Sequence, residues 1–183
     1  FTSAPPLKPL HYHSNIMEFH CLMKGRRTTQ IKTGSEDMIY TYTGNELFLT
    51  FPFERHGNIQ CSQHPCEFYA FQLIMNNPDS LLNLNKRYSN ILYQQLMHLP
   101  HRQYKMGTSH MQYLRQAFNF FSDLKEQSTA VGLQFLSTFL FSLPYLTPTE
   151  EAKILTMDAG IRKSISFLRE NLNEAIRLID LAS

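Results

Sequence analysis

The chain has 183 residues, of which hydrophobic types make up 43% and aromatic types 13%. This apolar share is enough to build a core and excludes a disordered chain. With 17 basic and 15 acidic residues the formal net charge is only +2, which excludes binding to DNA or to a membrane surface by overall charge. The longest apolar run, residues 133–143, contains polar residues and is shorter than the roughly 20 residues that span a bilayer.

Cysteine use and the N-terminus indicate the compartment. The three cysteines, Cys21, Cys61 and Cys66, are odd in number and lack a Cys-x-x-Cys spacing, which is typical of a reducing environment. No basic segment followed by an apolar one marks a signal peptide. We therefore expect a cytoplasmic protein without a membrane partner. Because the chain starts at Phe1 rather than at a methionine, we also expect a fragment.

Residues 16–76 have the pattern of β-structure. Short runs of β-branched and aromatic residues alternate with glycine-containing turns about ten residues apart, and no helical period runs between them. This pattern predicts an antiparallel sandwich or a small barrel. The clearest predicted strands are Arg26–Lys32, Met38–Thr43, Glu46–Phe51 and Glu67–Ile74.

After Pro78 the apolar residues repeat at three and four positions, which is the period of a helix. The predicted helices cover His110–Lys125, capped by Ser109, and Thr129–Leu143, which ends at Pro144. A weaker pattern, of one helix or two, occupies residues 80–99, and residues 149–157 form a short one. Residues 161–172 have the pattern of a clean amphipathic helix, and residues 175–182 begin another. Helices this aromatic either cover the β-structure or meet a second copy of the chain. For an isologous dimer we expect the contact at residues 111–121, which include Phe118, or at 133–143.

The side chains most suited to bind a metal or a ligand are concentrated near the start of the chain. His11 and His13 alternate along an extended segment and so face the same side. Glu18 opens the next strand, and His56 ends a later one. Three imidazoles and a carboxylate that converge can hold a divalent first-row metal. They can equally line a ligand pocket or hydrogen-bond one another, and spacing does not separate these alternatives.

Other chemical patterns are weaker. Cys21 follows His20 on a strand and faces the other way, which disfavours a Cys-His nucleophile. Cys61, His64 and Cys66 could form a zinc loop, but no fourth ligand is evident, and an ordinary hairpin is favoured. The basic stretch from Lys24 to Arg27 is expected to be a solvated hairpin tip.

Two motifs carry a family resemblance. His11-x-His13, followed by Glu18 and Gly25, resembles the first cupin motif, and the stretch from Gly44 to His56 resembles the second. In that second stretch Pro52 and His56 stand one residue closer than in metal-binding cupins. The whole string is similar to the effector-binding domain of AraC-family transcription regulators. Residues 161–182, with Leu178, Leu181 and Ala182, are similar to the opening of that family's helix-turn-helix DNA-binding domain.

The resemblance implies an α+β fold, in which a cupin-like antiparallel β-barrel of the double-stranded β-helix type precedes an α-helical dimerisation region. It divides the chain into an effector-binding barrel (1–78), a helical linker and dimerisation region (79–147) and the start of the DNA-binding domain (148–183). It also implies a small effector, sugar-like by preference, a homodimer, and DNA contact only through the missing C-terminal part. The implied effector-binding residues are His11, His13, Glu18, His20, His56, Tyr42 and Phe48.

On this interpretation the chain is not an enzyme and needs neither a metal nor another cofactor. Tyr42 and Phe48 would stack on the effector, although ordinary core packing is the alternative for each aromatic. A second hypothesis is a metal-dependent cupin enzyme, an isomerase or dioxygenase that uses His11, His13, Glu18 and His56 as ligands. A third is a binding module without regulatory role, whose C-terminal helix is a lid.

Overall fold

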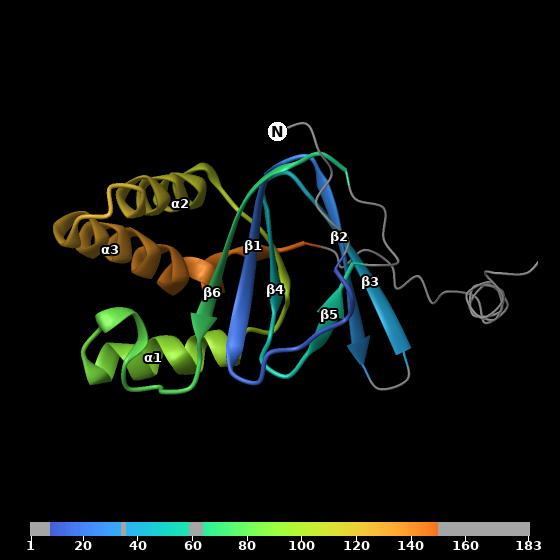
Figure 1. Ribbon diagram of the computed structural model, residues 1–183, viewed down its shortest axis with the longest axis horizontal. Coiled ribbons are helices and arrows are strands. Elements are labelled where there is room, and N and C mark those ends of the chain that lie inside the picture. Colours follow the sequence, from blue (N-terminus) through green and yellow to red (C-terminus); the bar gives the residue numbers. More distant parts are fainter. Residues whose placement is uncertain (1–7, 34–35, 59–63, 150–183) are drawn as a thin grey trace, which may run out of the picture.

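The computed structural model describes residues 8–33, 36–58 and 64–149. Within them the chain forms two antiparallel sheets and three α-helices (Figure 1). The five-stranded sheet has the order β6-β1-β4-β7-β8, and the three-stranded sheet has the order β3-β2-β5. The strands are β1 (Ile16–Lys24), β2 (Arg26–Thr33), β3 (Glu36–Thr43), β4 (Glu46–Thr50), β5 (Arg55–Gly57), β6 (Glu67–Ile74), β7 (Gln103–Lys105) and β8 (Thr147–Pro148).

Strand β1 is buried on both faces, because it lies between the helices and the second sheet. Met17, Phe19 and Cys21 belong to the large apolar cluster that includes the helices. The alternate residues point to the other side, where Leu22 joins a smaller cluster with residues of β2, β3 and β4. We call the side of β1 that carries Glu18, His20 and Leu22 its inner face.

The smaller cluster fills one end of the space between the sheets. Its buried members are Leu22, Ile31, Tyr40, Tyr42 and Phe48. The rings of Tyr42 and Phe48 stack with centroids 4.9 Å apart and planes 4° from parallel. This aromatic packing fixes the separation of the sheets on one side of Glu18 and His20.

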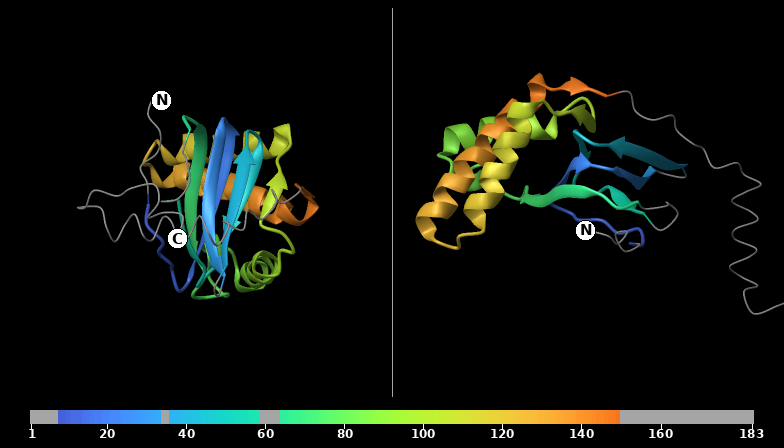
Figure 2. Two further views of the ribbon diagram at one scale, coloured as in Figure 1. Left: turned by 90° about the vertical axis from the view of Figure 1, so that its right-hand side faces the viewer. Right: turned by 90° about the horizontal axis from the view of Figure 1, so that it is seen from above.

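The helices form a layer on the outer face of the five-stranded sheet (Figure 2). They are α1 (Lys86–Met97), α2 (Thr108–Phe121) and α3 (Glu126–Ser142), with single 3₁₀ turns at Leu81–Asn83 and Leu143–Tyr145. Phe118 of α2 packs on Tyr69 of β6, with ring centroids 4.5 Å apart. Phe118 therefore belongs to the chain's own core, and a charge there would test folding rather than dimerisation.

Two details of the helix predictions are wrong. Helix α2 begins one residue earlier than its predicted cap, with Gly107 as the N-cap and no side-chain cap hydrogen bond, so Ser109 lies within the helix. Helix α3 begins at Glu126 rather than Thr129, because Lys125 already has the extended conformation of an N-cap. The short strands β7 and β8 were not predicted, since a run of two or three residues carries no period.

The α+β class and the antiparallel strands are confirmed, and Glu67–Ile74 has the predicted bounds. The described residues form two open sheets and no closed barrel. Helical patterns at 161–172 and 175–182, with the motif at Leu178, Leu181 and Ala182, lie outside the described residues, as does all but the first residue of 149–157. No described helix is long and apolar enough to cross a membrane.

Candidate functional site

Glu18 is the centre of a cluster of polar side chains between the sheets. It is 8% exposed, and Gln72 Nε2 donates a hydrogen bond to its Oε1. His13 Nε2 lies 3.3 Å from Oε1, and His56 Nε2 lies 3.1 Å from Oε2. One ligand atom from each of His11, His13, Glu18 and His56 lies within 4.8 Å of the other three. We call these four residues the Glu18 cluster.

Backbone pairing brings the N-terminal segment to this cluster. His11 and His56 exchange two backbone hydrogen bonds, of 2.9 and 2.8 Å, across an isolated antiparallel bridge. Their rings consequently lie 4.5 Å apart. A Cβ on Gly57 would come within 2.9 Å of the carbonyl oxygens of Lys8 and Pro9, so only glycine allows this approach.

Backbone carbonyls also orient two of the imidazoles. His56 Nδ1 lies 2.9 Å from the Glu54 carbonyl oxygen, and His11 Nδ1 lies 3.0 Å from that of Pro9. A carbonyl oxygen can only accept, so in both rings Nδ1 carries the proton, and the neutral ring has a bare Nε2. His56 Nε2 is buried and faces Glu18 Oε2, so it donates to that oxygen when the ring is protonated.

The charge states of the cluster follow from burial and from these partners. Burial alone would raise the pKa of Glu18, but hydrogen bonds from His20, His56 and Gln72 outweigh it and hold that pKa far below its usual range. Burial lowers the pKa of His20, and its hydrogen bond with Glu18 only partly offsets this effect. Burial opposes protonation of His56 as well, but Glu18 and the Glu54 carbonyl raise its pKa.

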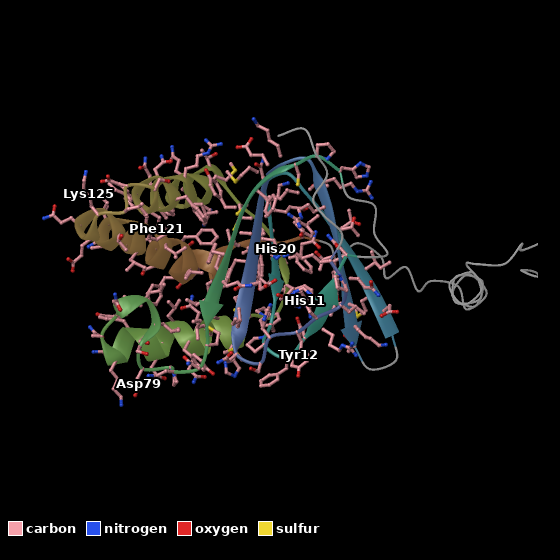
Figure 3. The ribbon with its side chains drawn as sticks, viewed as in Figure 1. His11, Tyr12, His20, Asp79, Phe121 and Lys125 are labelled. Carbon is pink, nitrogen blue, oxygen red and sulfur yellow. The ribbon has the colours of Figure 1, made fainter. Side chains whose placement is uncertain are left out.

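His20 connects the Glu18 cluster to the aromatic core. Its Nε2 lies 3.4 Å from Glu18 Oε2, and its Nδ1 lies 3.2 Å from the Tyr42 hydroxyl. Tyr42 also contacts the hydroxyl of Thr29 at 3.2 Å. Figure 3 shows His20 and His11 between the two sheets, whereas Phe121 lies in the helical layer.

The structure brings together five of the seven residues that the resemblance implies, namely His11, His13, Glu18, His20 and His56. Tyr42 and Phe48 are fully buried and stacked on each other, so the two rings form the packed core beside His20. A direct contact of either ring with an effector stays a prediction.

Arg27 belongs to this region, and sequence reasoning missed it. The expectation of a solvated basic tip holds for Lys24 and Arg26, which are exposed, but it is wrong for Arg27, which is 8% exposed. Arg27 lies on the inner side of β2, and its guanidinium carbon stands 4.0 Å over the Phe68 ring of β6. The alternation of β2 could have predicted the burial of Arg27, because Arg27 shares a face of the strand with Thr29 and Ile31.

A pocket of about 470 Å³ opens beside Glu18. This volume lies within the range of small-molecule sites. Charged, polar and aromatic residues from β1, β2, β6 and the N-terminal segment line it, among them Lys8, Glu18, His20, Arg27, Phe68 and Gln72. A smaller cavity of about 40 Å³ shares Glu18, His20 and Arg27 with this pocket and is also lined by His11, Thr29 and His56. We call these two adjoining spaces the inter-sheet pocket.

The two described cysteines, Cys21 and Cys66, take no part in this site. Cys21 faces the helical layer, opposite to His20, as the strand alternation predicts. Cys66 is partly buried near Phe68, and Cys61 lies outside the described residues. The only group of three or more potential metal ligands among the described residues is the Glu18 cluster, which gives a zinc loop at His64 and Cys66 no support.

Comparison with known proteins identifies no relative: no protein-family model matches the chain, and no curated protein matches it.

Proposed function

We propose that the chain is the ligand-sensing part of an AraC-type transcription regulator, in which a small molecule binds in the inter-sheet pocket. The observation that carries the proposal is the convergence of Glu18, His20 and Gln72 on a pocket of about 470 Å³ between two sheets. Glu18 accepts, and Gln72 both donates and accepts, which suits a hydroxylated, sugar-like ligand. The motif resemblance supplies the regulatory context.

In this proposal the two sheets correspond to the walls of a cupin-like barrel, and the helical layer transmits the bound state. A ligand can bias a regulator only if it binds two arrangements of the protein with different affinity. The pocket is built from β1 and β6, and the opposite faces of these strands carry Phe19 and Phe71, which pack toward α2 and α3. A shift of either strand therefore moves the helical layer, through which the homodimer would form and the DNA-binding units would be placed.

The binding part of the proposal is tested by thermal unfolding of the purified chain with a panel of neutral sugars and sugar acids. A true ligand at about 100 times its Kd adds about 2.7 kcal/mol to the free energy of unfolding. We expect Glu18→Ala and Gln72→Ala to remove this stabilisation, and Gln116→Ala, an exposed position on α2, to keep it. A panel without any stabilising compound, or one whose effect survives Glu18→Ala, contradicts the proposal.

The regulatory part is tested with the full product of the gene that encodes this chain. We expect it to protect a DNA segment from nuclease digestion, with a pattern that changes when the ligand is added. The Glu18→Ala variant should keep the protection and lose the response. A product that protects no DNA contradicts the regulator assignment.

A metal-dependent cupin enzyme is the second candidate, and a specific observation favours it. The rings of His11 and His56 are oriented by backbone carbonyls at Nδ1, so each has a bare Nε2 when it is neutral, which is the usual arrangement of metal-binding histidines. With Glu18 and His13 these atoms fit a divalent first-row cation, which would supply Lewis-acid chemistry at the pocket.

Metal content separates the two candidates. The enzyme hypothesis predicts near-stoichiometric metal in protein that was purified without an affinity tag, measured by elemental mass spectrometry. His13→Ala should lose that metal, whereas His98→Ala, at an exposed histidine beyond α1, should retain it. Metal far below one equivalent per chain in the untreated protein contradicts the enzyme hypothesis.

A further inference from the structure

We propose that the inter-sheet pocket recognises a carboxylate on its ligand, and that the guanidinium of Arg27 receives this carboxylate. The inference rests on the proposed pocket function and names the chemical class of the ligand. It is carried by a buried cation, two of whose donor nitrogens have no hydrogen-bond partner among the described residues.

Arg27 is 8% exposed and lines both parts of the inter-sheet pocket. Its Nε and Nη1 are buried and have no hydrogen-bond partner among the described residues. Its partners there are the Tyr42 hydroxyl and the face of the Phe68 ring. Neither carries a charge, and no ion pair joins Arg27 to a carboxylate in the described part of the chain. A buried cation in this situation is costly unless an anion joins it.

The shape of the group favours a planar oxyanion. A guanidinium has five N–H donors in one plane, and a carboxylate matches two of them at once. The Phe68 ring lies over one face of the Arg27 guanidinium, and Arg27 lines the pocket. Lys8 lines the same pocket and adds a second positive charge.

The neighbouring negative charge favours a carboxylate over a phosphate. Glu18 lines the same pocket and brings a carboxylate of the protein itself to it. Repulsion from Glu18 is smaller for a singly charged carboxylate than for a doubly charged phosphate. The remaining polar groups, Glu18 and Gln72, then suit hydroxyl groups on the body of the same ligand.

The test uses small probes that contain little besides the recognised group. Melting temperatures of the purified chain are measured against sodium acetate, acetamide and inorganic phosphate, with chloride added to constant ionic strength. We expect acetate to raise the melting temperature saturably and acetamide to leave it unchanged. Arg27→Gln should weaken the apparent affinity for acetate at least about 10-fold, because it removes a charge-assisted contact. Arg27→Lys should lie in between, since it keeps the charge and loses the planar donors.

Arg26→Gln is the matched control, because Arg26 precedes Arg27 on β2 and is exposed. It should respond to acetate as the wild type does. If Arg27→Gln fails to fold, the side-chain Nε–H signal of Arg27 is followed by NMR in the wild type instead, and it should shift with acetate and not with acetamide. An acetate effect no larger than that of chloride, or one that Arg27→Gln retains, overturns the inference. Stronger stabilisation by phosphate than by acetate overturns the carboxylate assignment.

Neutral galactose and glucose in the same plate separate the two proposals. If a neutral sugar stabilises the wild type but not Glu18→Ala, while acetate has no effect, the carboxylate inference fails and the pocket function stands. If neither sugars nor acids bind, the pocket function itself fails.

Discussion

At the scale of single residues, one ion pair holds the turn that delivers His56 to the site. Arg102 donates to both carboxylate oxygens of Glu54, at 2.8 and 2.9 Å. Glu54 also accepts from the backbone N–H of Phe51, and its own carbonyl orients the His56 ring. Phe53, which lies between Phe51 and Glu54 in this turn, has a φ of 66°. A residue other than glycine adopts this left-handed conformation at a cost in free energy. The ion pair therefore stabilises a strained turn beside the Glu18 cluster.

Arg102→Met should lower the free energy of unfolding by about 1–3 kcal/mol, because it leaves the half-buried Glu54 carboxylate without its bidentate partner. Chemical denaturation measures this change. Lys125→Met is the matched control, since Lys125 pairs with Asp123 at an exposed site, and it should leave the free energy of unfolding nearly unchanged. Equal losses in both variants would contradict a structural role of the turn.

Cys21 should be chemically silent in the folded protein. It is fully buried in β1, and burial raises the pKa of its thiol, so little thiolate is present at neutral pH. Iodoacetamide should therefore modify Cys66, which is partly exposed, much faster than Cys21. Peptide mapping by mass spectrometry before and after denaturation checks this order, and rapid labelling of Cys21 under native conditions would contradict the packing of β1 against the helices.

At the scale of elements, helices α2 and α3 approach each other closely at Gly132. A Cβ on Gly132 would lie 2.5 Å from Phe121 Cε1 and 3.1 Å from the Ala117 carbonyl oxygen. The glycine is thus required by the close crossing of the helices, even though glycine weakens a helix interior by about 1 kcal/mol relative to alanine.

Gly132→Ala should destabilise the protein by about 1–2 kcal/mol, because the clash with Phe121 exceeds the gain in helix propensity. The loss should shrink in a Phe121→Leu background, which removes the ring from that position. Thermal unfolding of the four proteins forms a double-mutant cycle. A Gly132→Ala variant that is more stable than the wild type would contradict the crossing.

The helices and strands also show which parts of the fold could be predicted from the sequence. Strong local periods predicted the strands of the first half and both long helices, because alternation and the 3.6-residue period report directly which face is buried. The pairing of the His11 segment with β5 joins residues far apart in the sequence, and no local periodicity of apolar residues predicts it. The sequence therefore identified four candidate site residues, His11, His13, Glu18 and His56, but it did not show that their ligand atoms lie close together. Arg27 was missed because a basic stretch at a turn is usually solvated.

At the scale of the whole molecule, the dimer stays a prediction. The structure limits the helix surfaces that could form the dimer contact. The helix face that carries Phe118 is used within the chain. Ala130 of α3 is exposed and lines a groove of about 480 Å³ with Leu82, Leu84 and Leu133, so this groove offers apolar surface for the predicted contact.

If α3 forms an isologous contact, the chain should scatter light with twice its mass of 21.4 kDa at micromolar concentration. Ala130→Arg should then give monomers, because it places a charge in the contact, and it should leave the melting temperature of the monomer unchanged. Gln94→Arg, at an exposed position of α1 outside both expected contacts, is the control. A wild type that remains monomeric would contradict the predicted contact.

The central claim is that the inter-sheet pocket holds a small organic molecule. The most direct measurement is native mass spectrometry of the untagged chain after incubation with a metabolite extract and removal of the unbound compounds. The account predicts an organic adduct on the wild type that Glu18→Ala loses and Gln116→Ala keeps. A chain with no adduct, or one that carries only a metal ion at the Glu18 cluster, would contradict it.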